Sequence, residues 1–523
     1  MIRSFLTVST GTLASRLLGF ARDSIIAALL GAGPVADAFL VAFQLVNVIR
    51  RLLTEGALNA ALVPAWLRIR DVEGAVAAAA FAGRILATVS AALISAAALI
   101  GVLMPMIITG LAPGFAGFPT LQLAIDDARL MLPYLAFAGP VTVMMALLNA
   151  QHRFALTAFL PLLFNVTLIA VMIMLLGWSP DPAFAARVIA VTVGAAGLLQ
   201  LAILMLRRGG DAPTPLRISF DAQMRGFLAT AIPGMIASCG PQLLVIAGAV
   251  IASTSPSAVS WLYFANRLIE LPLGIVGVAM GTVLVPELTH ALRGEDRAAV
   301  GYAQSRALEL AAGLALPAML GLIMLGEPVV RMLFQHGVFT ASDSAATAQA
   351  LIWLALGLPA HVLVKALSPA FFARQDTATP MMATLTGLVV AIVMAVILNR
   401  ISGVSGIAAG VACGAWSSTL VLLRRGAATF GFSIDAAARR RLPRIVAAAL
   451  AMGGLLWLVT RLAPVPSTHA LADAALLIML ISGAAAIYGL LLALLGVIRW
   501  GEALVALGRN APSDLRGQGP RGM

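Results

Sequence analysis

Residues 15–23 read SRLLGFARD, and this stretch places three charged side chains inside an otherwise apolar segment. The segment covers residues 4–30, which is long enough to cross a bilayer core as a helix. Arg16 and Asp23 are seven residues apart and share one helix face, whereas Arg22 lies about 120° away from Arg16. Charges inside a membrane helix cost at least about 2.5–3.5 kcal/mol each at the bilayer centre and normally face a bundle interior. We therefore expect this helix to line an interior site.

The whole chain has the composition of a membrane protein. Of its 523 residues, 61% are hydrophobic and 11% are charged, and the mean hydropathy is +1.00. A soluble domain has about 45–50% apolar and about 25% charged residues. We therefore expect an all-α integral membrane protein with about 14 transmembrane helices. The candidate spans are residues 4–30, 36–66, 76–108, 126–150, 155–177, 185–206, 226–252, 258–291, 303–333, 346–372, 379–399, 403–424, 442–462 and 471–497.

The arginines between these spans predict the orientation of the chain. If the spans alternate in direction, 22 loop arginines fall on one side of the membrane and four on the other. The positive-inside rule makes the arginine-rich side cytoplasmic, so we expect a multi-pass protein of the bacterial inner membrane with both termini in the cytoplasm. The net charge of +12 is then a topology signal, and we expect no nucleic-acid partner.

Two halves of the chain share a pattern at a nearly constant offset in residue number. The offset relates the Leu-Val-Pro sequence at 62–64 to that at 284–286, and Arg84 to Arg306. It spans six helices, an even number, so the halves run the same way through the membrane, with a substrate site between them. We expect an N-terminal six-helix lobe at 1–210, a C-terminal six-helix lobe at 211–430, two extra helices at 431–500 and a cytoplasmic tail at 501–523.

Two further spans carry polar residues at helical spacing. In the second span, Asn47 and Arg50 share a face, and Arg51 and Glu55 are spaced to form an i,i+4 pair. The eighth span carries Ser260, Tyr263 and Asn266, and places Arg267 and Glu270 at i,i+3.

The charges of these three spans do not balance. The five cations are Arg16, Arg22, Arg50, Arg51 and Arg267, and the four carboxylates are Asp23, Asp37, Glu55 and Glu270. Asp37 sits at the end of its span, where we expect water to reach it. At least one arginine lacks a dedicated partner and cannot shed its proton. An anion from outside the protein would satisfy it, and guanidinium groups bind phosphate oxygens in a bidentate manner.

Several motifs resemble those of the MurJ (MviN) family of lipid II flippases, within the multidrug/oligosaccharidyl-lipid/polysaccharide exporter superfamily. They occur in family order across nearly the whole chain, and the expected number of spans also fits. The motifs are SRLLGFARD at 15–23, Asp-Ala-Phe at 37–39, NVIRRLLTEG at 47–56, APGF at 112–115, LNAQHRF at 148–154, SWLYFANRLIELP at 260–272, FQHGVFT at 334–340 and ARQDTATP at 373–380.

The resemblance implies a flippase that carries lipid II, the polyprenyl-diphosphate-linked peptidoglycan precursor, from the cytoplasmic to the periplasmic leaflet. It also implies an apolar groove for the polyprenyl tail in the last two helices. The family often has Asp where this chain has Asn266, and span 226–252 has no acidic residue for a sodium site. The resemblance makes Arg16, Arg22, Arg50 and Arg267 the cavity arginines, with Asp37, Glu55 and Ser260 as further site positions; Asn47 and Asp23 complete our predicted substrate-binding set.

We expect an alternating-access transporter and not an enzyme, with no cofactor and no metal. No GxxxxGK[ST] motif for ATP is present, so the membrane potential or an ion gradient is the expected driving force. Expected partners are lipid II, membrane lipids and the cell-wall synthesis machinery. The alternatives are a related polysaccharide-lipid flippase, a drug exporter, a polyprenyl-diphosphate enzyme or a scaffold. A cation exporter would need an excess of carboxylates, an enzyme would need a carboxylate or histidine cluster at one membrane face, and a scaffold would need no charges at mid-membrane.

Overall fold

The computed structural model describes residues 2–497 except 55–56, 152, 207–213, 238–239, 280–296, 373, 375, 431–434 and 463–469. Over these residues the fold is all-helical, with one short 3₁₀ helix, η1. Proline begins several helices because its fixed φ suits the first helical position, where its missing N–H is not needed. The first half contains α1 (Ile2–Leu30), α2 (Pro34–Thr54), α3 (Ala57–Glu73), α4 (Ala75–Leu111), η1 (Pro113–Phe115), α5 (Pro119–Met131), α6 (Pro133–Ala150), α7 (Phe154–Trp178) and α8 (Pro182–Leu206).

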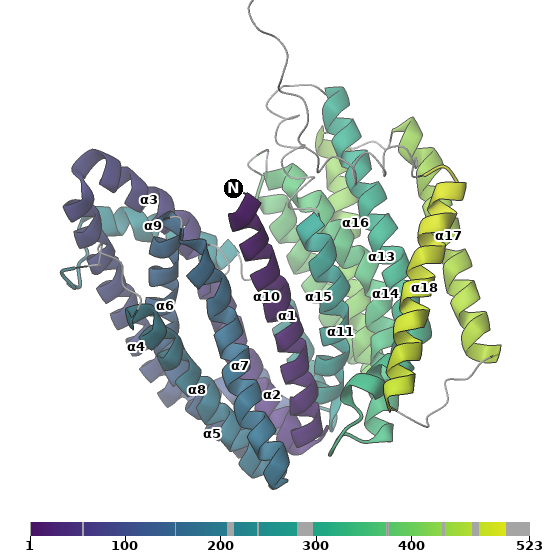
Figure 1. Ribbon diagram of the computed structural model, residues 1–523, viewed down its shortest axis with the longest axis horizontal. Coiled ribbons are helices and arrows are strands. Elements are labelled where there is room, and N and C mark those ends of the chain that lie inside the picture. Colours follow the sequence, from purple (N-terminus) through teal and green to yellow (C-terminus); the bar gives the residue numbers. More distant parts are fainter. Residues whose placement is uncertain are drawn as a thin grey trace, which may run out of the picture.

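The helices form two bundles that lie side by side (Figure 1). The first bundle comprises α1–α8 with η1, and the described part of the second comprises α10, α11 and α13–α16. Helices α17 and α18 lie at the outer edge of the second bundle, packed on α13 (Figure 1). The second half contains α9 (Ala222–Ala237), α10 (Gly240–Ala252), α11 (Ala258–Ala279), α13 (Arg297–Phe334), α14 (Ala341–Phe372), α15 (Ala378–Ser402), α16 (Val404–Phe430), α17 (Ala436–Leu462) and α18 (Ala470–Leu494).

The helix boundaries confirm the internal repeat. Helix α4 carries Arg84 and its counterpart α13 carries Arg306, the two residues that the repeat offset relates. These two helices end at Leu111 and Phe334, at the same offset to within one position. The joined helices α5 and α6 cover residues 119–150, and α14 covers 341–372, again at the repeat offset. The two bundles are therefore parallel repeats.

Helix α9 belongs to the second half of the sequence but packs against α3 of the first bundle. At its start, Asp221 Oδ1 accepts the Met224 N–H at 2.8 Å, which holds the pKa of that carboxyl below its ordinary value. Asp221 also lies 3.2 Å from Arg84 of α4, and Arg84 donates to Gln223 at 2.6 Å. These contacts fix the beginning of the second half onto the first bundle.

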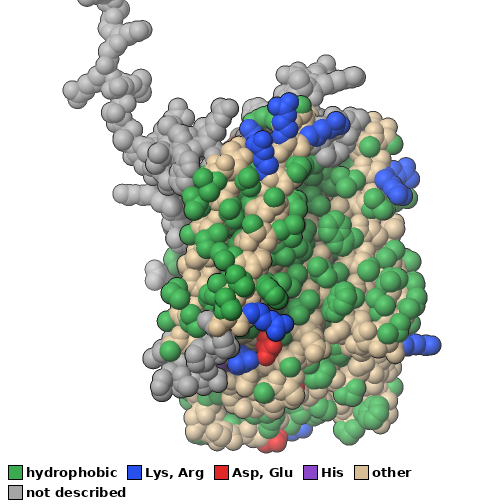
Figure 2. All heavy atoms as spheres, turned by 90° about the vertical axis from the view of Figure 1, so that its right-hand side faces the viewer, with side chains coloured by type: hydrophobic (Ala, Val, Ile, Leu, Met, Phe, Trp, Pro, Cys, Tyr) green, Lys and Arg blue, Asp and Glu red, His purple; other side chains and the backbone are tan. Residues whose placement is uncertain are grey.

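The outer surface of the described helices is apolar, as a lipid-facing surface must be. Ten of these helical segments are long and apolar enough to cross a membrane, and the protein is therefore a multi-pass membrane protein. Figure 2 shows the face formed by α17 and α18, where hydrophobic side chains are spread over the surface, basic side chains gather at the top, and a smaller group of basic and acidic side chains lies toward the other end. Exposed side chains on this face include Leu450, Trp457, Ile478 and Leu490.

The four predicted spans outside these ten correspond to α1, to α2 with α3, to α9 with α10, and to α11. Three of them carry the charges noted in the sequence, and charges lower hydropathy. Those three supply the candidate site.

Two polar contacts attach the last two helices to the second bundle. Arg441 of α17 lies 3.4 Å from the buried carboxylate of Glu309 on α13, which also binds Arg306 at 2.8 Å. The Tyr488 hydroxyl of α18 donates to the Gly313 carbonyl at 2.9 Å. The predicted tail beyond residue 500 lies outside the described residues.

Candidate functional site

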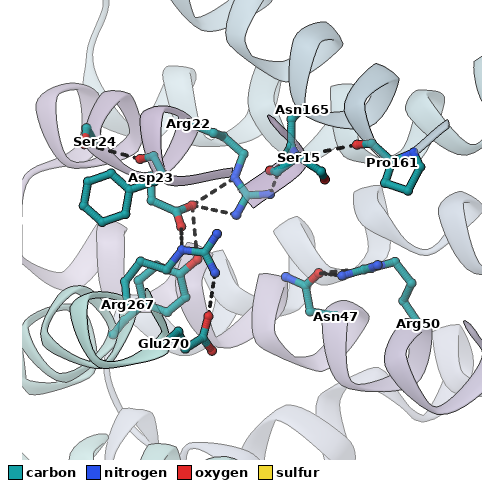
Figure 3. Close-up of polar contacts among 12 residues, drawn as sticks. Ser15, Arg22, Asp23, Ser24, Asn47, Arg50, Pro161, Asn165, Arg267 and Glu270 are labelled. Carbon is teal, nitrogen blue, oxygen red and sulfur yellow. Dashed lines mark hydrogen bonds and ion pairs between the residues drawn. The ribbon is translucent and has the colours of Figure 1, made fainter. Parts of the chain in front are cut away.

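A charge cluster lies where α1 faces α7 and α11 (Figure 3). Arg22 is buried and binds Asp23 through Nε at 2.9 Å and Nη2 at 2.6 Å. Its Nη1 donates to Asn165 Oδ1 of α7 at 3.0 Å, and the guanidinium lies 5.0 Å from the centre of the Phe43 ring. The Asn165 amide also donates to the Ser15 carbonyl at 3.2 Å. Arg22 is therefore fixed by Asp23, Asn165 and Phe43, which all belong to the first bundle.

Asp23 connects the two bundles. Its side chain is 0% exposed, and its second oxygen lies 2.6 Å from Nε of Arg267 on α11. Arg267 also binds Glu270 at 2.6 Å, which confirms the pair expected at i,i+3. The Tyr263 hydroxyl of α11 donates to Asp23 at 3.3 Å. A buried carboxylate held by arginines from both sides is a strong cross-bundle contact.

The remaining arginines of the predicted site lie around this cluster. Arg50 donates to Asn47 Oδ1 through Nε and Nη2, both at 3.4 Å, as expected from their shared face (Figure 3). Arg51 of α2 lies 3.6 Å from Glu270. Arg16 is exposed, and it forms no ion pair within the described part of the chain.

Asp37 and Ser260 form a second contact between the bundles. Asp37 Oδ1 accepts the backbone N–H of Ser260 at 2.9 Å and also accepts its hydroxyl. The expectation that water reaches Asp37 is wrong, because the residue is only 2% exposed. The physical reason is helix capping: Ser260 lies in the first turn of α11, where N–H groups lack intrahelical acceptors, and a carboxylate from α2 satisfies one of them.

Two loops add contacts at the same end of the molecule, where α1 ends and α11 begins. The Val338 N–H, in the loop between α13 and α14, donates to the Ala28 carbonyl of α1 at 2.9 Å. The Gly114 N–H of η1 donates to the Ser253 hydroxyl, just after α10, at 3.1 Å. Together with Asp37–Ser260 we call these contacts the three latches.

The two loop latches correspond through the repeat. Gly114 and Gly337 are separated by the repeat offset, and each loop docks on the end of the first spanning segment of the other half. A Cβ at Gly114 would collide with the Ser253 carbonyl, and a Cβ at Gly337 with the Ala28 carbonyl. The sequence motifs APGF and FQHGVFT therefore make equivalent contacts, and glycine is needed in both for close approach.

Aromatic rings fill the space between the charge cluster and the latches. Phe264 of α11 lies 5.0 Å from Phe334 and 5.5 Å from Phe339, centroid to centroid. Phe20 of α1, two residues before Arg22, lies 5.9 Å from Phe334. Phe20 and Phe334 therefore pack across the bundle boundary, and Phe264 lies on α11 between Ser260 and Arg267.

The structure brings together Arg22, Asp23 and Arg267 directly, and it pairs Asp37 with Ser260 at a separate contact. Glu55 lies outside the described residues. Sequence reasoning missed Asn165, which orients Arg22. The available signal was a single amide within a strongly apolar span, a position at which polar residues serve as helix-to-helix contacts.

The sequence matches the family profile described as "Lipid II flippase MurJ" over residues 26–472. The chain belongs to the MurJ family. A relative in Rhizobium meliloti (strain 1021), described as "Probable lipid II flippase MurJ", is 37% identical over 495 residues, covering 93% of this chain and 92% of that protein. A "Lipid II flippase MurJ" from Burkholderia cenocepacia is 32% identical over 434 residues, covering 81% of this chain and 83% of that protein.

Solved structures agree with the MurJ fold. One described as "Lipid II flippase MurJ, inward closed conformation" superposes with a TM-score of 0.76 at 21% identity, covering 94% of this chain and 98% of that one. An inward-facing multidrug resistance MATE family transporter of the MOP superfamily superposes with a TM-score of 0.66 at 17% identity, covering 84% and 98%. The chain therefore shares the fold of both solved structures.

Proposed function

We propose that this protein is a flippase that carries lipid II from the cytoplasmic to the periplasmic leaflet of the inner membrane by alternating access. Membership of the MurJ family supports lipid II as the substrate. The observation that carries the mechanism is the excess of arginine at the bundle boundary.

The described site has a formal excess of positive charge. The three charged spans carry five arginines and four carboxylates, and two of the carboxylates, Asp23 and Glu270, are paired with arginines in the described structure. The five arginines are Arg16, Arg22, Arg50, Arg51 and Arg267. A diphosphate between the bundles would offset their mutual repulsion and accept bidentate hydrogen bonds from their guanidinium groups. We assign the diphosphate and acidic headgroup of the substrate to this region, with Arg16, Arg22, Arg50 and Arg267 as its clamp.

The latches indicate which end of the bundle boundary is closed. If the arginine-rich loops are cytoplasmic, the three latches lie at the periplasmic end. The described conformation would then be closed to the periplasm by the latches and the aromatic rings. Transport would require the latches to break while the opposite ends of the bundles come together, as one repeat rocks against the other.

The membrane potential can supply part of the driving force. An inside-negative potential favours outward movement of negative charge by about 2.3 kcal/mol per charge per 100 mV. Helices α17 and α18 pack on the second bundle and expose an apolar face on their outer side. We place the polyprenyl tail along this face. The cell-wall synthesis machinery is the proposed recipient of the translocated precursor.

The superposition on a multidrug transporter makes drug export the second candidate. A cationic drug would require a net negative site, and the charge balance of the described site has the opposite sign. A related polysaccharide-lipid flippase would share the diphosphate chemistry, so the headgroup must be tested directly.

The decisive experiment is lipid II translocation by the purified protein in proteoliposomes, under an imposed potential and imposed ion gradients. Wild-type protein should move lipid II, and Arg16→Ala and Arg267→Ala should abolish movement while inserting normally. Full activity in both variants would exclude the clamp. Transport of another polyprenyl-diphosphate sugar but not of lipid II would exclude the substrate assignment.

A further inference from the structure

Two glycines, one on α1 and one on α11, lie directly beneath arginine side chains of the opposite helix. A Cβ built at Gly19 would lie 2.6 Å from Nη2 of Arg267, and a Cβ at Gly274 would overlap Nη1 of Arg16. Real Cβ atoms essentially never approach another heavy atom within 3.0 Å. Alanine therefore fits at neither position unless an arginine moves.

These contacts differ from ordinary helix packing through glycine. In α16, a Cβ at Gly410 or Gly414 would meet the backbone or Cβ of α15, which is the usual close approach of two helices. Among the glycines in the described ranges, Gly19 and Gly274 are the two whose missing Cβ leaves room for a guanidinium within 3.0 Å. Their contact is with a charged side chain and not with a helix backbone.

The two contacts are reciprocal. Arg16 and Gly19 are three residues apart on α1, and Arg267 and Gly274 are seven apart on α11, so each helix presents an arginine and a glycine on one face. Each arginine crosses from its own bundle to the glycine of the other. The long arginine side chains can bridge the bundle boundary because each glycine has no Cβ, so the guanidinium packs directly against its backbone.

The two arginines differ in what else holds them. Arg267 uses Nε for Asp23 and Nη1 for Glu270, so the contact at Gly19 accommodates its third nitrogen. Arg16 has no carboxylate partner in the part of the chain that the structure describes, and its guanidinium lies at Gly274. Among the described residues, an incoming anion can therefore bind Arg16 without breaking an ion pair.

We propose that Gly19 and Gly274 are positioning residues of the anion site, which seat Arg267 and Arg16 and so set the spacing of the two guanidinium groups across the bundle boundary. The inference rests on the proposed function, because it names what holds the clamp in place. The contacts of Arg267 with Gly19 and of Arg16 with Gly274, which we call the two seats, also join the bundles when no ligand is bound.

A double-mutant cycle tests the seat at Gly274. We expect Gly274→Ala to weaken lipid II binding by the purified protein about tenfold, the effect of one lost charge-assisted contact. In an Arg16→Ala background the same substitution should have no further effect, because no guanidinium remains to displace. An equal loss in both backgrounds would show that Gly274 acts through helix packing, and an unchanged affinity in the wild-type background would also overturn the proposal. The cycle of Gly19→Ala with Arg267→Ala should behave in the same way.

Gly321→Ala in α13 is the matched control, since a Cβ at Gly321 meets nothing within 4 Å. All three alanines raise helix propensity, so weaker binding cannot come from a weakened helix. The same cycles, measured by thermal unfolding without ligand, test the seats alone. If wild-type protein does not bind lipid II but the unfolding cycles show coupling, the seats stand and the substrate assignment fails. If the effects of the glycine and arginine substitutions on unfolding are additive, the two residues do not interact. The seats are then excluded, whichever substrate the protein carries.

Discussion

The carboxylate of Asp37 caps the first turn of α11 by binding Ser260, which lies in the other half of the chain at |i−j|=223. This separation matches the repeat offset, so the two residues occupy equivalent places in the two halves. Residues that meet their own counterparts lie close to the axis that relates the repeats. The Asp37 latch therefore sits at the centre of the latched end, with the Gly114 and Gly337 loops disposed around it.

Replacing Asp37 by Asn should open the central latch. The amide keeps the shape of the side chain but loses the charge that strengthens both hydrogen bonds from Ser260, which lowers each from about 1.5–3 kcal/mol to about 0.5–1.5 kcal/mol. We expect faster hydrogen–deuterium exchange at the start of α11, measured by mass spectrometry, and a lower unfolding temperature.

Ser260→Ala removes only the hydroxyl and keeps the backbone N–H on Asp37, so protection of the first turn should persist. Ser417→Ala is a control, because that hydroxyl bonds within its own helix to Gly414. Unchanged exchange in Asp37→Asn would show that the cap does not hold the bundles together.

Alanine at either loop glycine should weaken the latched end, and the two positions separate two causes. Gly114→Ala introduces only a collision with the Ser253 carbonyl. Gly337→Ala adds backbone strain to its collision, because φ is +58°, and a left-handed conformation costs an L-residue about 1–2 kcal/mol. We expect both variants to unfold at lower temperature, with Gly337→Ala the less stable.

Gly117→Ala isolates the strain, since φ there is +83° and a Cβ meets nothing within 4 Å. If Gly117→Ala matched Gly337→Ala in thermal unfolding, backbone strain alone would explain the loss and the loop contact would be unimportant.

Arg267→Lys should fail to support transport although it keeps the positive charge. Arg267 contacts Asp23, Glu270 and the Gly19 backbone through three different nitrogens, and a single ammonium cannot reach all three. Arg331→Lys, at the exposed pair with Glu327, should transport lipid II at the wild-type rate. Wild-type transport by Arg267→Lys would mean that charge alone suffices at this position.

Asn165→Leu should lower transport by freeing Arg22. Leucine has a similar volume but cannot accept the Arg22 N–H or donate to the Ser15 carbonyl. Thr167→Val on the same helix is the control, because the Thr167 hydroxyl bonds only to the Leu163 carbonyl within α7. A normal transport rate in Asn165→Leu, measured at equal protein levels in proteoliposomes, would show that Asp23 alone positions Arg22.

Helical periodicity predicts contacts within one helix and not those between helices. The Arg267–Glu270 pair and the Asn47–Arg50 contact follow from spacing, and both are present. The burial of Asp37 could not be predicted, because its acceptor role depends on how closely α11 approaches α2. A residue at the end of a span is exposed to water only when no other helix begins beside it.

The repeat and most spans were predictable because each follows from hydropathy and a constant offset. The arginine seats were not, since a glycine in an apolar helix has the same local pattern whether it faces lipid, a helix or a guanidinium. From the sequence, Gly274 has the pattern of an ordinary glycine in an apolar span. Only the path of Arg16 in three dimensions gives it a specific neighbour.

The correspondence of Gly114 with Gly337 gives the molecule an internal comparison. The two repeats carry different residues around the same contact, Ser253 on one side and Ala28 on the other. The first copy docks its glycine N–H on a side-chain hydroxyl, whereas the second docks the neighbouring Val338 N–H on a backbone carbonyl. A hydroxyl can be lost by a single point mutation and a carbonyl cannot. The Ala28 side of the closure is therefore the more robust to mutation, and divergence between the halves is better tolerated there than at Ser253.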